Sequence, residues 1–281
     1  MYWLPIACLF SFGFAQLFKW SQRRGCRGPI VVSANYLVLA CVLALYLLVT
    51  DRLELPPGAI KIGIITGIVF LTSMFVMTRA LEISDVAGVL TAFRMSIILP
   101  IGLAVWLWDE RVTPIQVVGI FLSLLALYLM THNPGSHNRL KGVGALGLLL
   151  SVFCLQGLAQ TCMRWVHYAG LSPDLVKVLV ITGLTAGVVG AIFTFLSGRR
   201  PTRPELVMGT GIGVFNALAL TINLVTLSHV PGTIYFPIMG SAVVLMDNLA
   251  ARFFWKEPLR RGGIAGAALA ILAILLVVGW R

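Results

Sequence analysis

Long apolar runs recur along the whole chain and are the feature that most constrains its fold. Each is close to the roughly 20 helical residues needed to cross a hydrocarbon core of about 30 Å. The runs are continuously apolar, whereas strands of a membrane barrel alternate in polarity, so we expect helices, which satisfy every backbone group internally. Ten segments are expected to span: Tyr2–Phe18, Ile30–Thr50, Ile62–Thr78, Val86–Trp108, Val112–Thr131, Gly142–Met163, Val178–Ser197, Leu206–Ser228, Thr233–Phe254 and Gly262–Trp280.

The composition agrees with a membrane protein and excludes other classes. Hydrophobic residues make up 59% of the 281 residues and charged residues only 11%, against roughly 25% charged in a soluble domain. The net charge of +11 comes from short basic clusters between the apolar runs, a distribution typical of contact with lipid headgroups and not of nucleic-acid binding. Neither the five cysteines nor the four histidines show metal-ligand spacing, and we expect no metal or other cofactor.

An internal repeat divides the chain into two halves. Residues 104–126 align with residues 251–273 at an offset of 147, and seven of 23 positions are identical, including the Trp and Glu of a Trp-x-Glu motif and a Gly nine residues after that Glu. Gly-Phe-Ala-Gln at 13–16 also matches Gly-Leu-Ala-Gln at 157–160. Two five-helix repeats, residues 1–131 and 142–281, are therefore expected. An odd number of spans per half makes the repeats inverted, an arrangement typical of alternating-access transporters.

Three stretches carry a resemblance to a known family: residues 79–90, 109–119 and 256–266, the last two with an acidic residue near the start of the fifth and tenth segments. With ten spans in a five-plus-five arrangement, the chain resembles the EamA-like branch of the drug/metabolite transporter superfamily. The resemblance covers nearly the whole chain. It implies secondary active transport of a small metabolite, often export, through a cavity lined mainly by helices one, three, four, six, eight and nine.

The orientation of the chain stays open. Connections on the side of the first loop carry 14 Lys and Arg residues, whereas the other side, with both termini, carries six. The positive-inside rule would place the termini outside, while the family resemblance implies cytoplasmic termini. In either case an even number of spans places both termini on one side.

Polar groups inside the spans are the candidates for a substrate site, because such groups are costly in lipid and usually face a cavity or a partner. For each amide the alternative is a helix–helix hydrogen bond, worth about 0.6 kcal/mol on average. Glu110 and Glu257, which precede the fifth and tenth segments, are interpreted as helix caps. The candidate substrate-binding residues are Arg94, Asp247, Asn216, Gln156, Gln160, Gln16 and Tyr235.

Arg94 and Asp247 are the two charges expected well inside spans, and their depths agree. Arg94 lies eight residues after Val86, about 12 Å from the start of its helix. Asp247 lies seven residues before Phe254, where its helix ends on the same side. An unpaired charge at either position would cost on the order of 3 kcal/mol, so we predict that the two side chains pair. The alternative is that Arg94 reaches the headgroups and Asp247 bonds to a neighbouring backbone or amide group.

The sequence therefore favours a multi-pass transporter in the cell membrane, moving a small polar or amphipathic solute, with export favoured. No nucleotide-binding loop or catalytic motif is present, so a gradient and not ATP is expected to drive it. The alternatives are a membrane-embedded enzyme or a subunit of a membrane complex. The expected partners are the solute and the bilayer, not nucleic acid, and a homodimer stays open.

Overall fold

The structure is a computed structural model that describes residues 2–52, 54–83, 86–131, 143–198, 200–254 and 261–279. The chain is 88% helical, and no strand occurs within these ranges. The expected all-α class is confirmed.

The first half contains six helices, listed here in chain order: α1 (Trp3–Arg23), α2 (Gly28–Val49), α3 (Pro57–Ile83), α4 (Val86–Met95), α5 (Ile98–Trp108) and α6 (Pro114–Thr131). The second half contains a single-turn 3-10 helix and five α-helices: α7 (Val143–Tyr168), η1 (Ser172–Asp174), α8 (Leu175–Leu196), α9 (Arg203–His229), α10 (Gly232–Phe253) and α11 (Arg261–Gly279). Since α4 and α5 form one broken span, ten spans result, as the sequence predicts.

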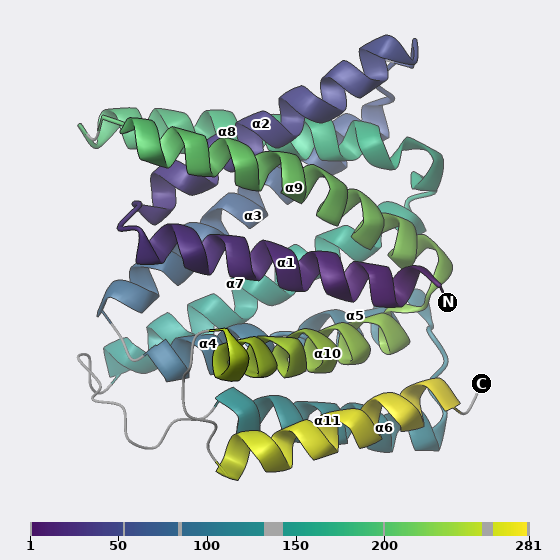
Figure 1. Cartoon of the computed structure of the whole chain (residues 1–281). Helices are drawn as coiled ribbons and strands as arrows, with labels where there is room; N and C mark the ends of the chain where they lie inside the picture. The colour runs from purple at the N-terminus through teal and green to yellow at the C-terminus, as the bar shows by residue number, and fades with distance from the viewer. Residues whose placement is uncertain are drawn as a thin grey trace.

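Among the residues that the structure describes, six helices are long and apolar enough to cross a membrane, and three further apolar helices are shorter. The chain is a multi-pass membrane protein. The start of α1 and the end of α11 lie on the same side of the bundle, the right side in Figure 1, which agrees with an even number of spans. We call this side the terminal face and the other side the opposite face.

The two halves use equivalent helices in exchanged roles. Helix α1 packs on α9 as α7 packs on α3, and α2 packs on α9 as α8 packs on α3. Helices α2 and α8 pair with each other at one end of the bundle, and α6 and α11 pair at the other (Figure 1). Helix α1 runs away from the terminal face, whereas α7 runs toward it (Figure 1). This exchange is what two inverted five-helix repeats require.

The fourth span is broken, which the sequence analysis did not predict. Helix α4 ends at Met95 and α5 begins at Ile98. Pro100 explains the break, because a proline supplies no N–H to the carbonyl four residues earlier, here Ser96, and its ring clashes with that carbonyl. The Ser96 carbonyl instead accepts a hydrogen bond from the Leu99 N–H at 3.0 Å, a tighter turn.

Close backbone contacts hold α2, α3, α8 and α9 together. A Cβ added at Gly67 in α3 would come within 2.7 Å of the Thr182 carbonyl oxygen in α8, and one at Gly213 in α9 would come equally close to the Asn35 carbonyl oxygen in α2. Such contacts supply packing where lipid removes the hydrophobic drive between helices. The glycines at four-residue spacing in these helices, Gly63 and Gly67 in α3 and Gly209 and Gly213 in α9, therefore mark a tightly packed block.

Glu205 positions the ends of two helices on the opposite face. Glu205 forms a capping box with Thr202 at the start of α9, which satisfies otherwise unpaired backbone donors. The same carboxylate accepts a hydrogen bond from the Arg27 guanidinium at 2.7 Å. Arg27 precedes α2 and is half-buried, and its hydrogen bond to Glu205 raises the pKa of its guanidinium. This contact joins the first connection of the chain to the second half.

Candidate functional site

Arg94 in α4 and Asp247 in α10 form an ion pair inside the bundle. An Arg94 Nη2 donates to Asp247 Oδ2 at 2.7 Å. The two residues come from different halves and meet because their depths match and because α10 packs against α1 and against α5, which continues the span of α4. The predicted contact between these two charges is confirmed.

Gln16 of α1 completes this group. Its side-chain amide donates to Asp247 Oδ1 at 2.8 Å, so each carboxylate oxygen of Asp247 has a donor from a different helix. The Arg94 and Asp247 side chains are 22% and 23% exposed. Lys19, one turn further along α1, is near enough to act electrostatically on Asp247. We call Gln16, Arg94 and Asp247 the central cluster.

Gln160 and Gln156 lie one turn apart on α7 but have different partners. Gln160 donates to the Ser96 hydroxyl at 3.4 Å, at the break between α4 and α5. Gly157 lets α7 approach this break, because a Cβ there would come within 3.0 Å of the Ser96 carbonyl oxygen. Gln156 accepts from the Ser73 hydroxyl of α3 at 2.9 Å. Both amides therefore make helix–helix hydrogen bonds, the alternative considered from the sequence.

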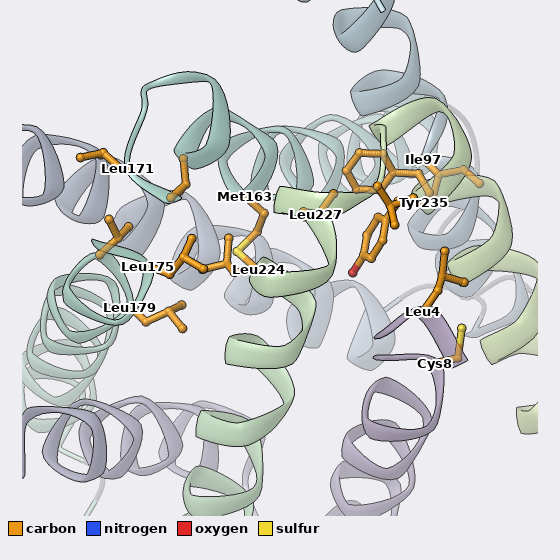
Figure 2. Packing of buried hydrophobic residues seen from close by; sticks show 14 of the residues in the cluster. Leu4, Cys8, Ile97, Met163, Leu171, Leu175, Leu179, Leu224, Leu227 and Tyr235 are labelled. Atoms are coloured by element: carbon orange, nitrogen blue, oxygen red, sulfur yellow. The ribbon is translucent and has the colours of Figure 1, made fainter. Parts of the chain in front are cut away.

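Asn216 and Tyr235 are buried. Asn216 lies three residues after Gly213 and so shares the side of α9 that packs on α2. Tyr235 lies edge-on to Phe236, with ring centroids 5.1 Å apart, and belongs to the apolar core that includes Leu4 and Cys8 (Figure 2). These positions fit packing, and a role for either residue in binding substrate stays a prediction.

Asn223 and Asn248, two further amides in the spans, have an interhelical and a local partner respectively. Asn223 of α9 exchanges hydrogen bonds with Ser11 of α1. Asn248, next to Asp247, donates to the Val244 carbonyl of its own helix at 2.9 Å. Within the described residues, no group of three metal-ligating side chains occurs.

A second charged group, around Arg164 of α7, lies toward the terminal face. Arg164 Nε and Nη2 donate to Glu110 Oε1 at 2.9 and 2.5 Å. Its Nη1 donates to the carbonyls of Leu227 and Val230 at the end of α9. The Tyr168 hydroxyl donates to Glu110 Oε1 at 2.9 Å. Arg164 and Glu110 are 4% and 6% exposed, and we call Glu110, Arg164 and Tyr168 the terminal cluster.

Glu110 caps a different helix from the one expected. The sequence suggested a cap for the helix that follows it, but its carboxylate accepts from the backbone N–H groups of Gly232 and Thr233 at 3.0 and 2.9 Å. These are the first two residues of α10, whose N–H groups have no partner inside the helix. Glu257, its equivalent in the repeat, and Trp255 lie outside the described residues.

The pKa of Glu110 follows from these contacts. Burial alone would raise it, but the Thr233 N–H, the Arg164 charge and the Gly232 N–H outweigh burial, so the pKa lies below its ordinary value. Glu110 is therefore ionised at neutral pH.

Sequence reasoning missed the terminal cluster because the apolar run ends at Met163, which placed Arg164 in a connection. The helix continues to Tyr168, so Arg94 and Asp247 are not the only charges deep in the bundle. A signal was available. Gln156, Gln160, Arg164 and Tyr168 recur every four residues, which places them along one side of α7.

Comparison with known proteins supports this reading of the fold. Residues 1–132 match the EamA-like transporter family. An uncharacterized protein of Haemophilus influenzae is 22% identical over 288 residues, covering 98% of this chain and 96% of that protein. A solved crystal structure superposes with a TM-score of 0.77 at 13% identity, covering 96% of this chain and 97% of the other. The first half of the chain, residues 1–132, therefore resembles the EamA-like transporter family, and the solved structure has the same fold over nearly the whole chain.

Proposed function

We propose that this protein is a secondary active transporter that exports a small polar or amphipathic metabolite across the cell membrane, with the central cluster as its substrate site. The observation that carries the proposal is the ion pair between Arg94 and Asp247, which joins the two halves inside the bundle at 2.7 Å and is about one-fifth exposed.

The chemistry of the central cluster suits a solute with polar groups. Arg94 offers several N–H donors in a planar fork, of which one Nη2 contact to Asp247 is described, and Asp247 offers two acceptor oxygens. A solute carrying an acceptor and a donor would replace the contact between the two residues by contacts of its own. Each residue would then keep a partner in the low-dielectric interior, so exchange avoids leaving an unpaired charge.

A gradient would supply the driving force. The sequence has no nucleotide-binding loop, and Asp247 is an ionisable group at the contact between the halves. Taking up a proton would remove the charge that holds Arg94 and Gln16, so protonation and solute binding would compete for the same carboxylate. We propose that this competition couples a proton to transport.

The test is transport by the purified protein in liposomes, with a panel of labelled amino acids, nucleosides, sugars and organic cations, under an imposed pH gradient. Asp247→Asn and Arg94→Gln should each slow transport on the order of tenfold to a hundredfold, the effect of losing a charge-assisted hydrogen bond. Asn248→Ala is the matched control, because Asn248 is the next residue and bonds only to its own helix in the contact described.

The proposal fails if both charge variants transport at the wild-type rate, or if transport continues after all ion gradients are collapsed but requires ATP. Efflux from liposomes loaded with labelled solute, compared with uptake by liposomes diluted into that solute, distinguishes export from import.

A further inference from the structure

We propose that the terminal cluster is the gate that closes the solute pathway at the terminal face. This inference rests on the proposed transport function and deepens it. Alternating access requires a set of contacts at each end of the pathway, and the two sets close in turn.

The terminal cluster joins four separate parts of the chain at one point. Arg164 belongs to α7, Glu110 to the connection between α5 and α6, and their partners are the end of α9 and the start of α10. Helices α9 and α10 are joined by two residues, Val230 and Pro231, with extended backbone at both. Arg164 bonds on one side of this short connection and Glu110 on the other, so the pair holds both helix ends against α7.

An apolar layer lies next to this cluster. Leu4, Cys8, Leu227 and Tyr235 come from α1, α9 and α10 and form part of one core (Figure 2). All four are less than 10% exposed. Leu227 also supplies a carbonyl to Arg164, so the ion pair and the apolar layer share the end of α9. Opening the terminal face therefore requires the ionic contacts and the apolar layer to separate together.

The central cluster has the opposite character. Its charged side chains are 22% and 23% exposed, against 4% and 6% in the terminal cluster. Lys19 lies one turn from Gln16 in the direction of the opposite face. This difference in burial is what we expect of a state with the terminal end closed and the central charges partly accessible. In the other state of the cycle the Arg164–Glu110 contact must break, and the opposite face must close.

A fixed structural contact would give the same picture in one state, so the test measures a shift between two states. Cys8 is a natural reporter, because it lies five residues into α1 from the terminal face and is 5% exposed. Replacing the other four cysteines with serine leaves Cys8 alone. In a second background without Cys8, Lys19→Cys reports access from the opposite face.

Two variants release the proposed gate. Glu110→Gln removes the charge and keeps the shape of the side chain. Glu110→Met combined with Arg164→Met removes both charges, so no buried charge is left unpaired and the chain assembles even where the single variant does not. Lys177→Gln is the control, since it breaks the Asp174–Lys177 pair at the start of α8 on the same face.

Both reporters are labelled with a membrane-impermeant thiol reagent in right-side-out and inside-out vesicles. Releasing the gate should raise the labelling rate of Cys8 from the terminal face about tenfold or more. It should also lower the labelling rate of Lys19→Cys from the opposite face, because a larger fraction of molecules in one state leaves a smaller fraction in the other. Lys177→Gln should change neither rate.

Unchanged rates in both gate variants would overturn the proposal, and so would a rise at both reporters, which indicates a loosened structure instead of a shifted equilibrium. The measurement needs no substrate. Failure of the proposed function therefore appears in the liposome assay, and failure of the gate appears here.

Discussion

The two ion pairs inside this bundle contain the same kinds of groups in different settings. Glu110 accepts from Arg164, Tyr168 and two backbone N–H groups and is almost fully buried. Asp247 accepts from Arg94 and Gln16 and keeps about a fifth of its surface exposed. A carboxylate with all its acceptor positions occupied by fixed donors holds structure together. A carboxylate with two side-chain partners and partial exposure can exchange one of them for a ligand.

The largest effect should come from leaving Glu110 buried without its cation. Arg164→Met should lower the free energy of unfolding by about 3–5 kcal/mol, the range for a broken buried pair. Arg94→Gln should cost much less, because the site is partly exposed and glutamine can still donate to Asp247. Unfolding by SDS titration of the purified variants measures the difference. Equal losses in the two variants would remove the contrast between the clusters.

Acid should also destabilise the protein through the terminal cluster. Since the folded-state pKa of Glu110 lies below its ordinary value, its contribution to stability is complete above about pH 4.3, the unfolded value. It is lost as the pH falls from there through the folded pKa. The contribution of Glu110 to the free energy of unfolding should thus be constant between pH 5 and 8 and decline below pH 4. In Glu110→Gln the decline should be smaller, and identical acid profiles for both proteins would contradict the assignment.

A contact outside both clusters gives a smaller effect. Gly67→Ala places a methyl group about 2.7 Å from the Thr182 carbonyl oxygen and should cost about 1–3 kcal/mol through overpacking. The control is Gly102→Ala, where an added Cβ meets nothing within 4 Å. Thermal denaturation followed by size-exclusion chromatography compares the two. A Gly67→Ala protein as stable as Gly102→Ala would show that the α3–α8 contact can relax.

The smallest expected effect comes from Tyr168, where two substitutions distinguish the contribution of the hydroxyl from that of the ring. Tyr168→Phe removes the hydrogen bond to Glu110 and the longer one from Arg164, but it keeps the stacking on Trp108, whose ring centroid lies 4.6 Å away. The loss should be about 0.5–1.5 kcal/mol. Tyr168→Leu also removes the stacked pair and should lose a further 0.5–1.5 kcal/mol or so. If both variants are equally stable in the same denaturation assay, the ring makes no contribution of its own.

The sequence was sufficient for the membrane class, the number of spans and the contact between Arg94 and Asp247. Apolar length and residue depth are one-dimensional quantities, and both can be counted along the chain. The broken fourth span was not predicted although Pro100 marks it, because the run from Val86 to Trp108 is apolar throughout and hydropathy does not register a missing N–H.

The terminal cluster required three-dimensional information. Arg164 lies beyond its apolar run, and its partner Glu110 lies 54 residues earlier, so neither depth nor spacing connects them. The polar series on α7 identified a side of the helix but not which helices that side meets. The partners of Gln156, Gln160 and Arg164 are on α3, at the α4–α5 break and after α5 respectively.

The inverted arrangement has a consequence for how the chain is made. Helices α1 and α7 are equivalent in the repeat, and the ribosome delivers both in the same N-to-C direction, yet they must enter the membrane in opposite senses. Hydrophobicity cannot distinguish them, so the flanking charges must. Four Lys and Arg residues occur in residues 19–27 at the end of α1, and one, Arg164, occurs in the equivalent stretch of residues 163–171 at the end of α7. After duplication, the two copies could keep similar spans only by acquiring different charges at their ends.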